Sequence, residues 1–138
     1  MTVLRPQAPG IPVPTPSATS APYWEACADG VLTFQRCDAC GAIPARATTV
    51  CASCSARSLS WVPSRGEGSL YSWTVVWRPA DPTFTVPYAP AIVTLDEGWW
   101  LMSAVVGCTP DELLADMRLR VEFHPAGSGI VLPYVTPA

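Results

Sequence analysis

The chain has 138 residues, of which 49% are hydrophobic and only 14% are charged, and its formal net charge is −3. This length suits one domain or two very small ones, and the apolar share is sufficient for a buried core. No run of 18 apolar residues is present, which argues against a membrane-spanning helix and a membrane partner. The N-terminus lacks a basic segment followed by an apolar stretch, so we expect no signal peptide and a cytoplasmic protein.

Charge is distributed unevenly along the chain, and all eight cationic residues are arginines. Residues 1–65 contain five arginines and three acidic residues, formally +2. Residues 66–138 contain three arginines and eight acidic residues, formally −5. Proteins that bind nucleic acid place clustered cations on the phosphate backbone, so the acidic C-terminal half argues against such a partner.

The N-terminal segment, residues 1–19, contains five prolines among small residues. Prolines at this density cannot form a helix or an interior strand, so we predict an extended or disordered arm. It is either a free tail or an arm that lies across a partner.

A short helix is predicted over residues 20–30, with Ser20 as its cap and Gly30 as its end. The adjacent aromatic residues Tyr23 and Trp24 need cover, because so short a helix is not stable alone. We therefore expect this helix to dock on another part of the molecule.

Two Cys-x-x-Cys pairs stand ten residues apart, after a predicted strand over residues 31–36. A two-residue gap lets both sulfurs of one pair point at the same place, and two such turns together present four thiolates in a tetrahedron, as structural zinc requires. Gly41 follows the first pair directly and suits a tight turn that needs positive φ. We predict one structural Zn²⁺ with no open coordination position. Its ligands are Cys37, Cys40, Cys51 and Cys54.

Two disulfides or one redox pair are the alternatives for these cysteines. A redox pair would be expected alone and inside a βαβ pattern, which the sequence lacks. The other two cysteines, Cys27 and Cys108, have no evident base near them in sequence, and we interpret them as small core residues. Zinc thiolates with two free cysteines are typical of a reducing compartment.

A series of short strands follows the cysteine-rich segment, which closes at residues 59–63. Residues 69–78 alternate cleanly and predict a strand with Tyr71, Trp73 and Trp77 on the face that a small barrel must fill. The remaining predicted elements are strands at residues 91–95, 99–106, 119–123 and 130–135, a turn at 96–98, and a short capped helix at 109–115.

Three strands, a short helix and two more strands make up the element order of a five-stranded OB-type barrel. Closure of the barrel also removes exposed strand edges in a domain of this size. We therefore predict a mainly β chain with an N-terminal helix, a rubredoxin-like zinc ribbon and a five-stranded OB-fold barrel. The predicted boundaries are 1–19 for the arm, 20–62 for the helix and ribbon, and 63–138 for the OB-fold domain.

The Pro-rich loop at residues 79–90 is long for a connection between barrel strands, and such loops are usually functional or disordered. Its prolines reduce the entropy lost on ordering, and interfaces concentrate aromatic residues. We predict that it faces a partner's active-site entrance, with a decorative insertion as the alternative. The residues assigned to the partner surface and substrate channel are Tyr23, Trp24, Trp73, Trp77, Phe84, Pro87 and Tyr88.

No catalytic constellation is evident in the sequence. His124, the single histidine, stands on the presumed polar side of a strand and is typical of a surface residue. We therefore predict a protein that is not an enzyme by itself. The rival interpretation is a single-stranded nucleic-acid binder, in which Tyr71, Trp73 and Trp77 form a stacking platform. The charge of the predicted barrel, formally −5 over residues 66–138, argues against it.

Several motifs resemble the DUF35 family over about residues 20–135. They are Tyr-Trp-Glu in the predicted helix, a strand ending in Cys-x-x-Cys-Gly, a second Cys-x-x-Cys, and Gly-x-Gly-x-Leu-Tyr-Ser-Trp at the start of the barrel. The four cysteines match the metal positions of that family. The resemblance implies a zinc ribbon joined to an OB-fold.

The same resemblance implies a non-catalytic accessory subunit of a thiolase-fold enzyme acting on acyl-CoA thioesters. Partners in that family include thiolases, acyltransferases, hydroxymethylglutaryl-CoA synthase and the lipid-transfer-protein-like retro-aldolases of sterol side-chain breakdown. Among these we favour a retro-aldol carbon–carbon lyase. We expect a hetero-oligomer built on the partner's dimer, in which this chain contacts acyl-CoA only indirectly.

Overall fold

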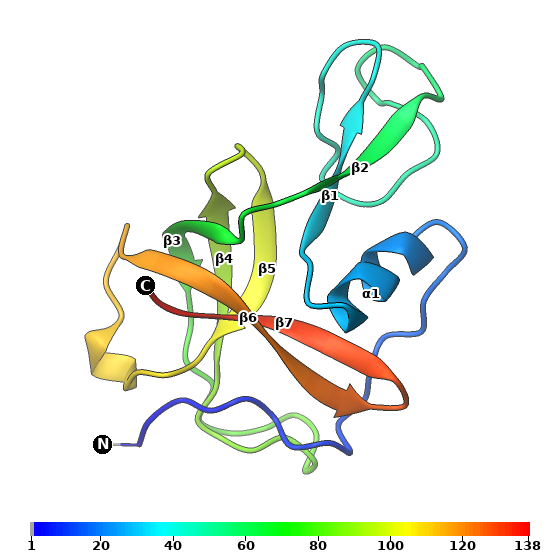
Figure 1. The fold of residues 1–138 in the computed structure, drawn as a ribbon. Helices are drawn as coiled ribbons and strands as arrows, with labels where there is room; N and C mark the ends of the chain where they lie inside the picture. Colours follow the sequence, from blue (N-terminus) through cyan, green and yellow to red (C-terminus); the bar gives the residue numbers. More distant parts are fainter. Residues whose placement is uncertain (1) are drawn as a thin grey trace.

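A two-stranded sheet and a closed barrel divide the chain, and a short helix lies beside them (Figure 1). The computed structural model describes residues 2–138. Helix α1 (Ala21–Ala28) precedes β1 (Thr33–Cys37) and β2 (Leu59–Pro63), which pair antiparallel in the ribbon. The barrel consists of β3 (Glu67–Trp73), β4 (Ala89–Leu95), β5 (Trp100–Val105), β6 (Arg118–Gly127) and β7 (Ile130–Pro137).

The barrel strands neighbour one another in the order β3-β4-β5-β7-β6, and the sheet is closed. This order and the 3₁₀ helix η1 (Pro110–Glu112) between β5 and β6 confirm the predicted OB-fold barrel. The described residues contain no helix with the length and apolarity that crossing a membrane requires.

The barrel core is made of aliphatic side chains from every strand. Leu70 of β3, Leu119 of β6 and Val135 of β7 have no exposed surface. At Gly68 of β3 a side chain would collide with the carbonyl oxygen of Thr94 in the neighbouring strand β4, so this close approach of the two backbones requires glycine.

The prediction of a strand over residues 69–78 was wrong about its length and about which of its side chains are buried. Strand β3 ends at Trp73, and a register shift between Leu70 and Ser72 marks a bulge. The bulge puts two residues against one of the partner strand, so strict alternation fails. Leu70 faces the core, whereas Tyr71 and Trp77 are 56% and 59% exposed. Among the predicted aromatic residues, Trp73 packs partly against the core.

The predicted helix at residues 109–115 is only the single turn η1. Its capping box is present, because the Thr109 backbone N–H donates to Glu112 Oε2 over 2.7 Å. The chain leaves the helical conformation at Leu113, whose backbone is extended.

The N-terminal arm packs along the chain's own barrel and is not a free tail (Figure 1). The Leu4 N–H donates to the Cys108 carbonyl over 2.8 Å, and the Gly107 N–H donates to the Leu4 carbonyl over 2.9 Å. The Leu4 side chain is 1% exposed, and Ile11 is also buried. The arm therefore contributes to the barrel's packing.

Helix α1 docks between β1 and β7, and this packing leaves Tyr23 and Trp24 half-buried, which gives them the cover that so short a helix needs (Figure 1). Gly30, with φ of +75°, follows the helix as predicted. Ser20 occupies the N-cap position, but its hydroxyl accepts from the Ser17 N–H over 2.9 Å and makes no cap bond to the helix. The predicted side-chain cap at Ser20 was therefore wrong.

The ribbon meets the barrel at the hairpin between β4 and β5. Phe34 of β1 stacks on Trp99 with ring centroids 5.4 Å apart. Glu97, in the hairpin turn, accepts from the Ser64 hydroxyl over 2.7 Å and from the Arg65 N–H over 3.0 Å. These contacts hold the linker between the two units.

Candidate metal centre and apolar groove

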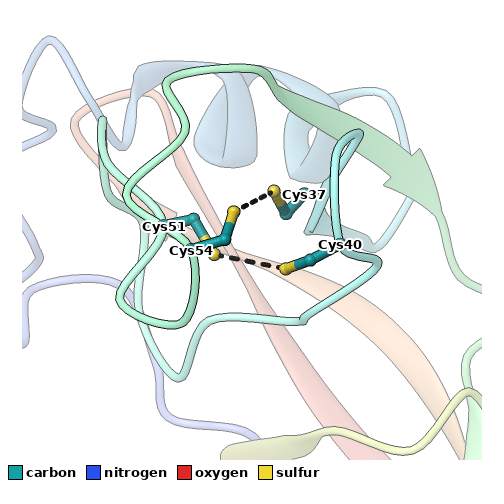
Figure 2. Close-up of side chains that lie close together, drawn as sticks. All are labelled: Cys37, Cys40, Cys51 and Cys54. Carbon is teal, nitrogen blue, oxygen red and sulfur yellow. Dashed lines mark hydrogen bonds between the residues drawn. The ribbon is translucent and has the colours of Figure 1, made fainter.

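The four predicted ligands lie on two turns that repeat the same backbone pattern. The Gly41 N–H donates to the Cys37 carbonyl and the Ser55 N–H to the Cys51 carbonyl, over 2.9 and 2.8 Å. Residue Gly41 has φ of +77°, as predicted, and its counterpart Ser55 has φ of +64°. Sequence reasoning missed Ser55, because serine carries no signal for this conformation. The two turns face each other and bring the sulfurs together (Figure 2).

The spacing of the sulfurs fits a tetrahedral metal ion. All four Sγ atoms lie within 4.8 Å of one another, and the Cys37–Cys54 and Cys40–Cys51 pairs are 3.6 Å apart. Four sulfurs at the usual zinc–sulfur distance of about 2.3 Å would be about 3.8 Å apart. A disulfide requires about 2.05 Å, and all six cysteines are free in the structure. The site can therefore hold one metal ion with four sulfur ligands.

Backbone donors around the sulfurs favour the thiolate form. The N–H groups of Cys54 and then Ser53 bond the Cys51 sulfur and lower the pKa of that thiol to about 6. The Ala56 N–H lowers the pKa of Cys54 in the same way. Hydrogen bonds with the neighbouring thiols, Cys37 first, outweigh it and raise this pKa to about 12. Clustered thiols resist losing all their protons together, and a bound cation removes that obstacle.

A second candidate site is an apolar groove where the barrel is least tightly closed. Strands β5 and β7 are paired only at Val105 and Val135 in the described residues. A groove of about 400 Å³ extends from this point. Arg5 is the one charged side chain among the described residues that line it. The other lining residues are Gln7, Ile11, Pro12, Pro14, Tyr23, Trp24, Phe84, Tyr88, Pro90, Met102, Ser103, Ala104, Val105, Leu132, Pro133 and Tyr134.

The structure brings four of the seven residues predicted for the partner surface to this groove. They are Tyr23 and Trp24 of α1 and Phe84 and Tyr88 of the Pro-rich loop. The rings of Phe84 and Tyr88 stack with centroids 5.5 Å apart. Sequence spacing gave no reason to expect the helix and the loop in one place.

The other three predicted residues lie apart from the groove lining. Trp73 borders a neighbouring hollow of about 220 Å³ that shares Pro90 and Met102 with the groove. Trp77 is exposed beyond the end of β3, and Pro87 lies inside the loop.

Two features of this surface were missed from the sequence. The exposed rings of Tyr71 and Trp100 stack 4.8 Å apart on the outside of the barrel. Gln7, in the N-terminal arm, lines the groove and is buried. Gln7 is the only residue in segment 1–19 with a side-chain amide, which both donates and accepts hydrogen bonds. This is the one feature of the sequence that could have indicated its role.

The two cysteines outside the four-cysteine cluster are buried, as predicted. Cys27 has no exposed surface, and burial raises the pKa of its thiol to about 11. Cys108 is 5% exposed, and burial raises its pKa as well. Thiols with raised pKa values are poor nucleophiles at neutral pH. His124 Nε2 donates to the Glu122 carboxylate over 2.9 Å at the barrel surface.

Residues 61–124 match a protein-family model described as the C-terminal OB-fold domain of ChsH2. The chain is 32% identical over 127 residues to a probable enoyl-CoA hydratase alpha subunit of Thermomonospora curvata, matching 92% of this chain and 40% of that protein. It is 28% identical over 91 residues to a DUF35 domain-containing scaffold protein of Methanocaldococcus jannaschii, covering 64% of each. The chain thus spans less than two thirds of the length of both these relatives.

A DUF35 domain-containing scaffold protein of Methanothermobacter thermautotrophicus is 32% identical over 95 residues, which are 67% of this chain and 71% of that protein. Among solved structures, the chain matches the Ltp2-ChsH2(DUF35) aldolase with a TM-score of 0.85 and 30% identity, over 91% of this chain and 98% of that one. A DUF35 protein of unknown function from Sulfolobus solfataricus has a TM-score of 0.61 at 14% identity, over 88% and 86% of the two chains, and shows the fold alone.

Proposed function

The chain belongs to the DUF35 family, and on that premise we propose that it is a non-catalytic accessory subunit of an enzyme acting on acyl-CoA thioesters. The observation that carries the proposal is the similarity to 98% of a chain in a complex named as an Ltp2-ChsH2(DUF35) aldolase. The likeness to a protein named as a probable enoyl-CoA hydratase subunit supports the acyl-CoA class of substrate. The partner in this proposal is a thiolase-fold enzyme, with a retro-aldolase of sterol side-chain breakdown as the favoured case.

The metal in this proposal is one structural Zn²⁺ held by the four clustered cysteines. Soft thiolate ligands select zinc or iron–sulfur chemistry, and a mononuclear tetrahedral site with four sulfurs is typical of structural zinc. With four protein ligands, such an ion leaves no position for substrate. Its contribution is therefore to fix the ribbon, not to activate a bond.

The apolar groove is proposed to face the entrance of the partner's active site. It is lined by the aromatic side chains Trp24, Phe84 and Tyr88, which are the kind of residue that interfaces concentrate. A wall of this kind would exclude water from the acyl group and hold the thioester in position. It would accelerate the partner's reaction without a reacting group from this chain.

The sparse cations support an indirect role toward coenzyme A. Phosphate groups are bound by clustered arginines or lysines, whereas the groove has Arg5 as its one charged residue among those described. We therefore expect the isolated chain to bind acyl-CoA weakly and to catalyse no turnover.

The decisive experiment assays three samples: the thiolase-fold enzyme encoded in the same gene neighbourhood, this protein alone, and both together. We expect a stable complex, with turnover of acyl-CoA only when both are present. Turnover by this protein alone would refute the proposal, and so would a partner that is equally active and soluble without it.

The variants Phe84→Ala and Tyr88→Ala test the position of the groove in that complex. They should reduce turnover or assembly without changing the melting temperature of the isolated subunit, because both side chains lie in a loop and not in the core. Thr83→Ala, at the exposed tip of the same loop, is the matched control. If Phe84→Ala and Tyr88→Ala leave the complex unaffected, the groove does not face the active site.

A further inference from the structure

The N-terminal arm forms one wall of the apolar groove. Three of its apolar side chains, Ile11, Pro12 and Pro14, line the groove together with the edges of β5 and β7. Figure 1 shows the arm running past the Pro-rich loop and the β6–β7 hairpin. The matched family model covers only residues 61–124, so this wall is built by a segment outside it.

A single buried glutamine fixes the arm to the loop. The Gln7 amide nitrogen donates to the Thr85 carbonyl over 2.9 Å, and the Thr85 N–H donates to the Gln7 amide oxygen over 2.8 Å. The Gln7 backbone N–H also donates to the Tyr134 hydroxyl of β7 over 3.1 Å. Gln7 thus joins three walls of the groove, which are the arm, the loop and β7.

The same device holds a second loop elsewhere in the molecule. In the ribbon, the Gln35 amide nitrogen donates to the Thr48 carbonyl over 3.0 Å, and the Thr48 N–H donates to the Gln35 amide oxygen over 2.9 Å. A glutamine amide presents a donor and an acceptor side by side, as a strand backbone does, so it can pair with one residue of a loop that has no strand partner. Gln35 is equally buried, and it provides an internal control for Gln7.

We propose that the arm is the specificity-determining wall of the groove and that Gln7 is its positioning residue. On the proposed function, which this inference assumes, the ligand is the apolar acyl group of the partner's thioester substrate. The groove volume of about 400 Å³ lies within the usual range for small-molecule sites, and its lining is predominantly apolar, as such sites require. Gln7 acts indirectly, since its bonds hold Thr85 beside the stacked rings of Phe84 and Tyr88.

The arm sets the space that is open to the acyl group. Ile11 is 8% exposed, and among the described lining residues it is the one branched aliphatic side chain that the arm contributes. A change of one methylene in an apolar site alters selectivity by about tenfold or more. Shortening Ile11 should therefore shift selectivity toward bulkier acyl groups.

The pairing of Gln7 with Thr85, which we call the clamp, is tested on the isolated protein. The measurement is the rate of limited chymotrypsin digestion after Phe84 and Tyr88. Gln7→Met removes both amide bonds at similar side-chain size, and we expect loop cleavage to accelerate about tenfold. Gln35→Met removes the equivalent pair of bonds in the ribbon and should leave loop cleavage unchanged. Equal cleavage rates in wild type and Gln7→Met would overturn the clamp, and so would a rise at sites throughout the chain.

The specificity wall is tested in the complex with the neighbouring thiolase-fold enzyme. The probes are two β-hydroxyacyl-CoA thioesters, one with a short linear acyl group and one with a bulky polycyclic group. We expect Ile11→Ala to change the ratio of their kcat/KM values by about tenfold, and Gln7→Met to change it in the same assay. Val3→Ala, an exposed arm residue that does not line the groove, should leave the ratio unchanged.

The two proposals fail in different ways. A complex that forms and keeps the wild-type ratio in both variants would overturn the specificity wall and leave the accessory function standing. No complex, and no effect of wild-type protein on the enzyme, would overturn the accessory function and with it the wall. The chymotrypsin result would then still decide whether Gln7 clamps the loop.

Discussion

The ribbon and the barrel hold their folds by different means. Between the ribbon strands β1 and β2, over residues 38–58, Cys51 is the only buried residue. The barrel instead buries at least one aliphatic side chain from every strand, with Leu70, Leu119 and Val135 completely inside. A segment with so little buried apolar surface cannot offset its conformational entropy by burial. The comparison implies that the ribbon depends on the proposed metal ion, whereas the barrel is held by its core.

Removing the metal should have the largest effect, and this effect should be confined to the ribbon. Apparent binding energies of structural zinc are about 10–16 kcal/mol, more than the stability of a small ribbon, so chelation should unfold the ribbon while the barrel persists. Amide resonances in a two-dimensional NMR spectrum would show which unit is lost. Cys40→Ser should have the same effect as chelation.

Cys108→Ser provides the control for the metal prediction, because Cys108 is buried beside the barrel and is not part of the cluster. This variant should retain one zinc per chain by metal analysis. Freshly purified wild-type protein that is fully folded with clearly less than one zinc would contradict the structural role of the metal.

The barrel should respond to the loss of core volume and not to chelation. Leu70 has no exposed surface, and Leu70→Ala should lower the free energy of unfolding of the barrel by about 2–5 kcal/mol through lost burial and a cavity. Leu114, which is 66% exposed, is the matched control, and Leu114→Ala should stay within about 0.5 kcal/mol. Urea unfolding of the zinc-loaded proteins measures both. A Leu70→Ala barrel as stable as wild type would show that the core does not hold it.

The sequence predicted what spacing and local pattern encode. The two cysteine pairs, the turn at Gly41 and the order of the barrel elements along the chain follow from residues near one another in sequence. Burial along β3 did not follow, because the bulge after Leu70 inverts an alternation that looked regular. Partial burial of Trp73 shows that the aromatic pattern was only partly informative.

The groove could not be assembled from the sequence for a different reason. Gln7 and Thr85 are 78 residues apart, and their pairing depends on the path of the arm over a finished barrel. The contact between the ribbon and the β4–β5 hairpin of the barrel, which we call the joint, could not be predicted for the same reason. Phe34 and Trp99 meet only when ribbon and barrel are both formed. Contacts between separate units leave no periodic signal in either partner.

Acid should weaken the joint between the ribbon and the barrel. Burial acts to raise the pKa of Glu97, but hydrogen bonds from the Arg65 N–H, the Ser64 hydroxyl and the Trp99 indole outweigh it, and the pKa is lowered. A carboxylate with a depressed folded-state pKa stabilises the fold above its unfolded value of about 4.3, and this contribution is lost as pH falls through the folded pKa. We therefore expect the joint to loosen below about pH 4.

The indole N–H of Trp99 donates to Glu97 over 3.2 Å, so its NMR shift reports on the joint directly. Glu97→Gln should cost about 1 kcal/mol at neutral pH and remove the acid-dependent change of this shift. Asp81→Asn is the control, because hydrogen bonds from the Thr83 hydroxyl and N–H, within the Pro-rich loop, also lower the pKa of Asp81. A titration of the indole shift that is unaltered in Glu97→Gln would assign the acid response to another group.

The smallest predicted effect lies inside the ribbon, between its two otherwise equivalent turns. Gly41 and Ser55 hold the same left-handed position, with φ of +77° and +64°. A non-glycine residue in this conformation costs about 1 kcal/mol or more, whereas glycine is penalised by the entropy it loses on folding.

Ser55→Gly should therefore be net stabilising by about 0.5 kcal/mol, which corresponds to about a twofold gain in apparent zinc affinity. Gly41→Ser should do the opposite, since a Cβ there meets open space and only the backbone strain remains. Competition with a chelator measures both, and a loss of zinc affinity in Ser55→Gly would show that the two turns are not equivalent in energy.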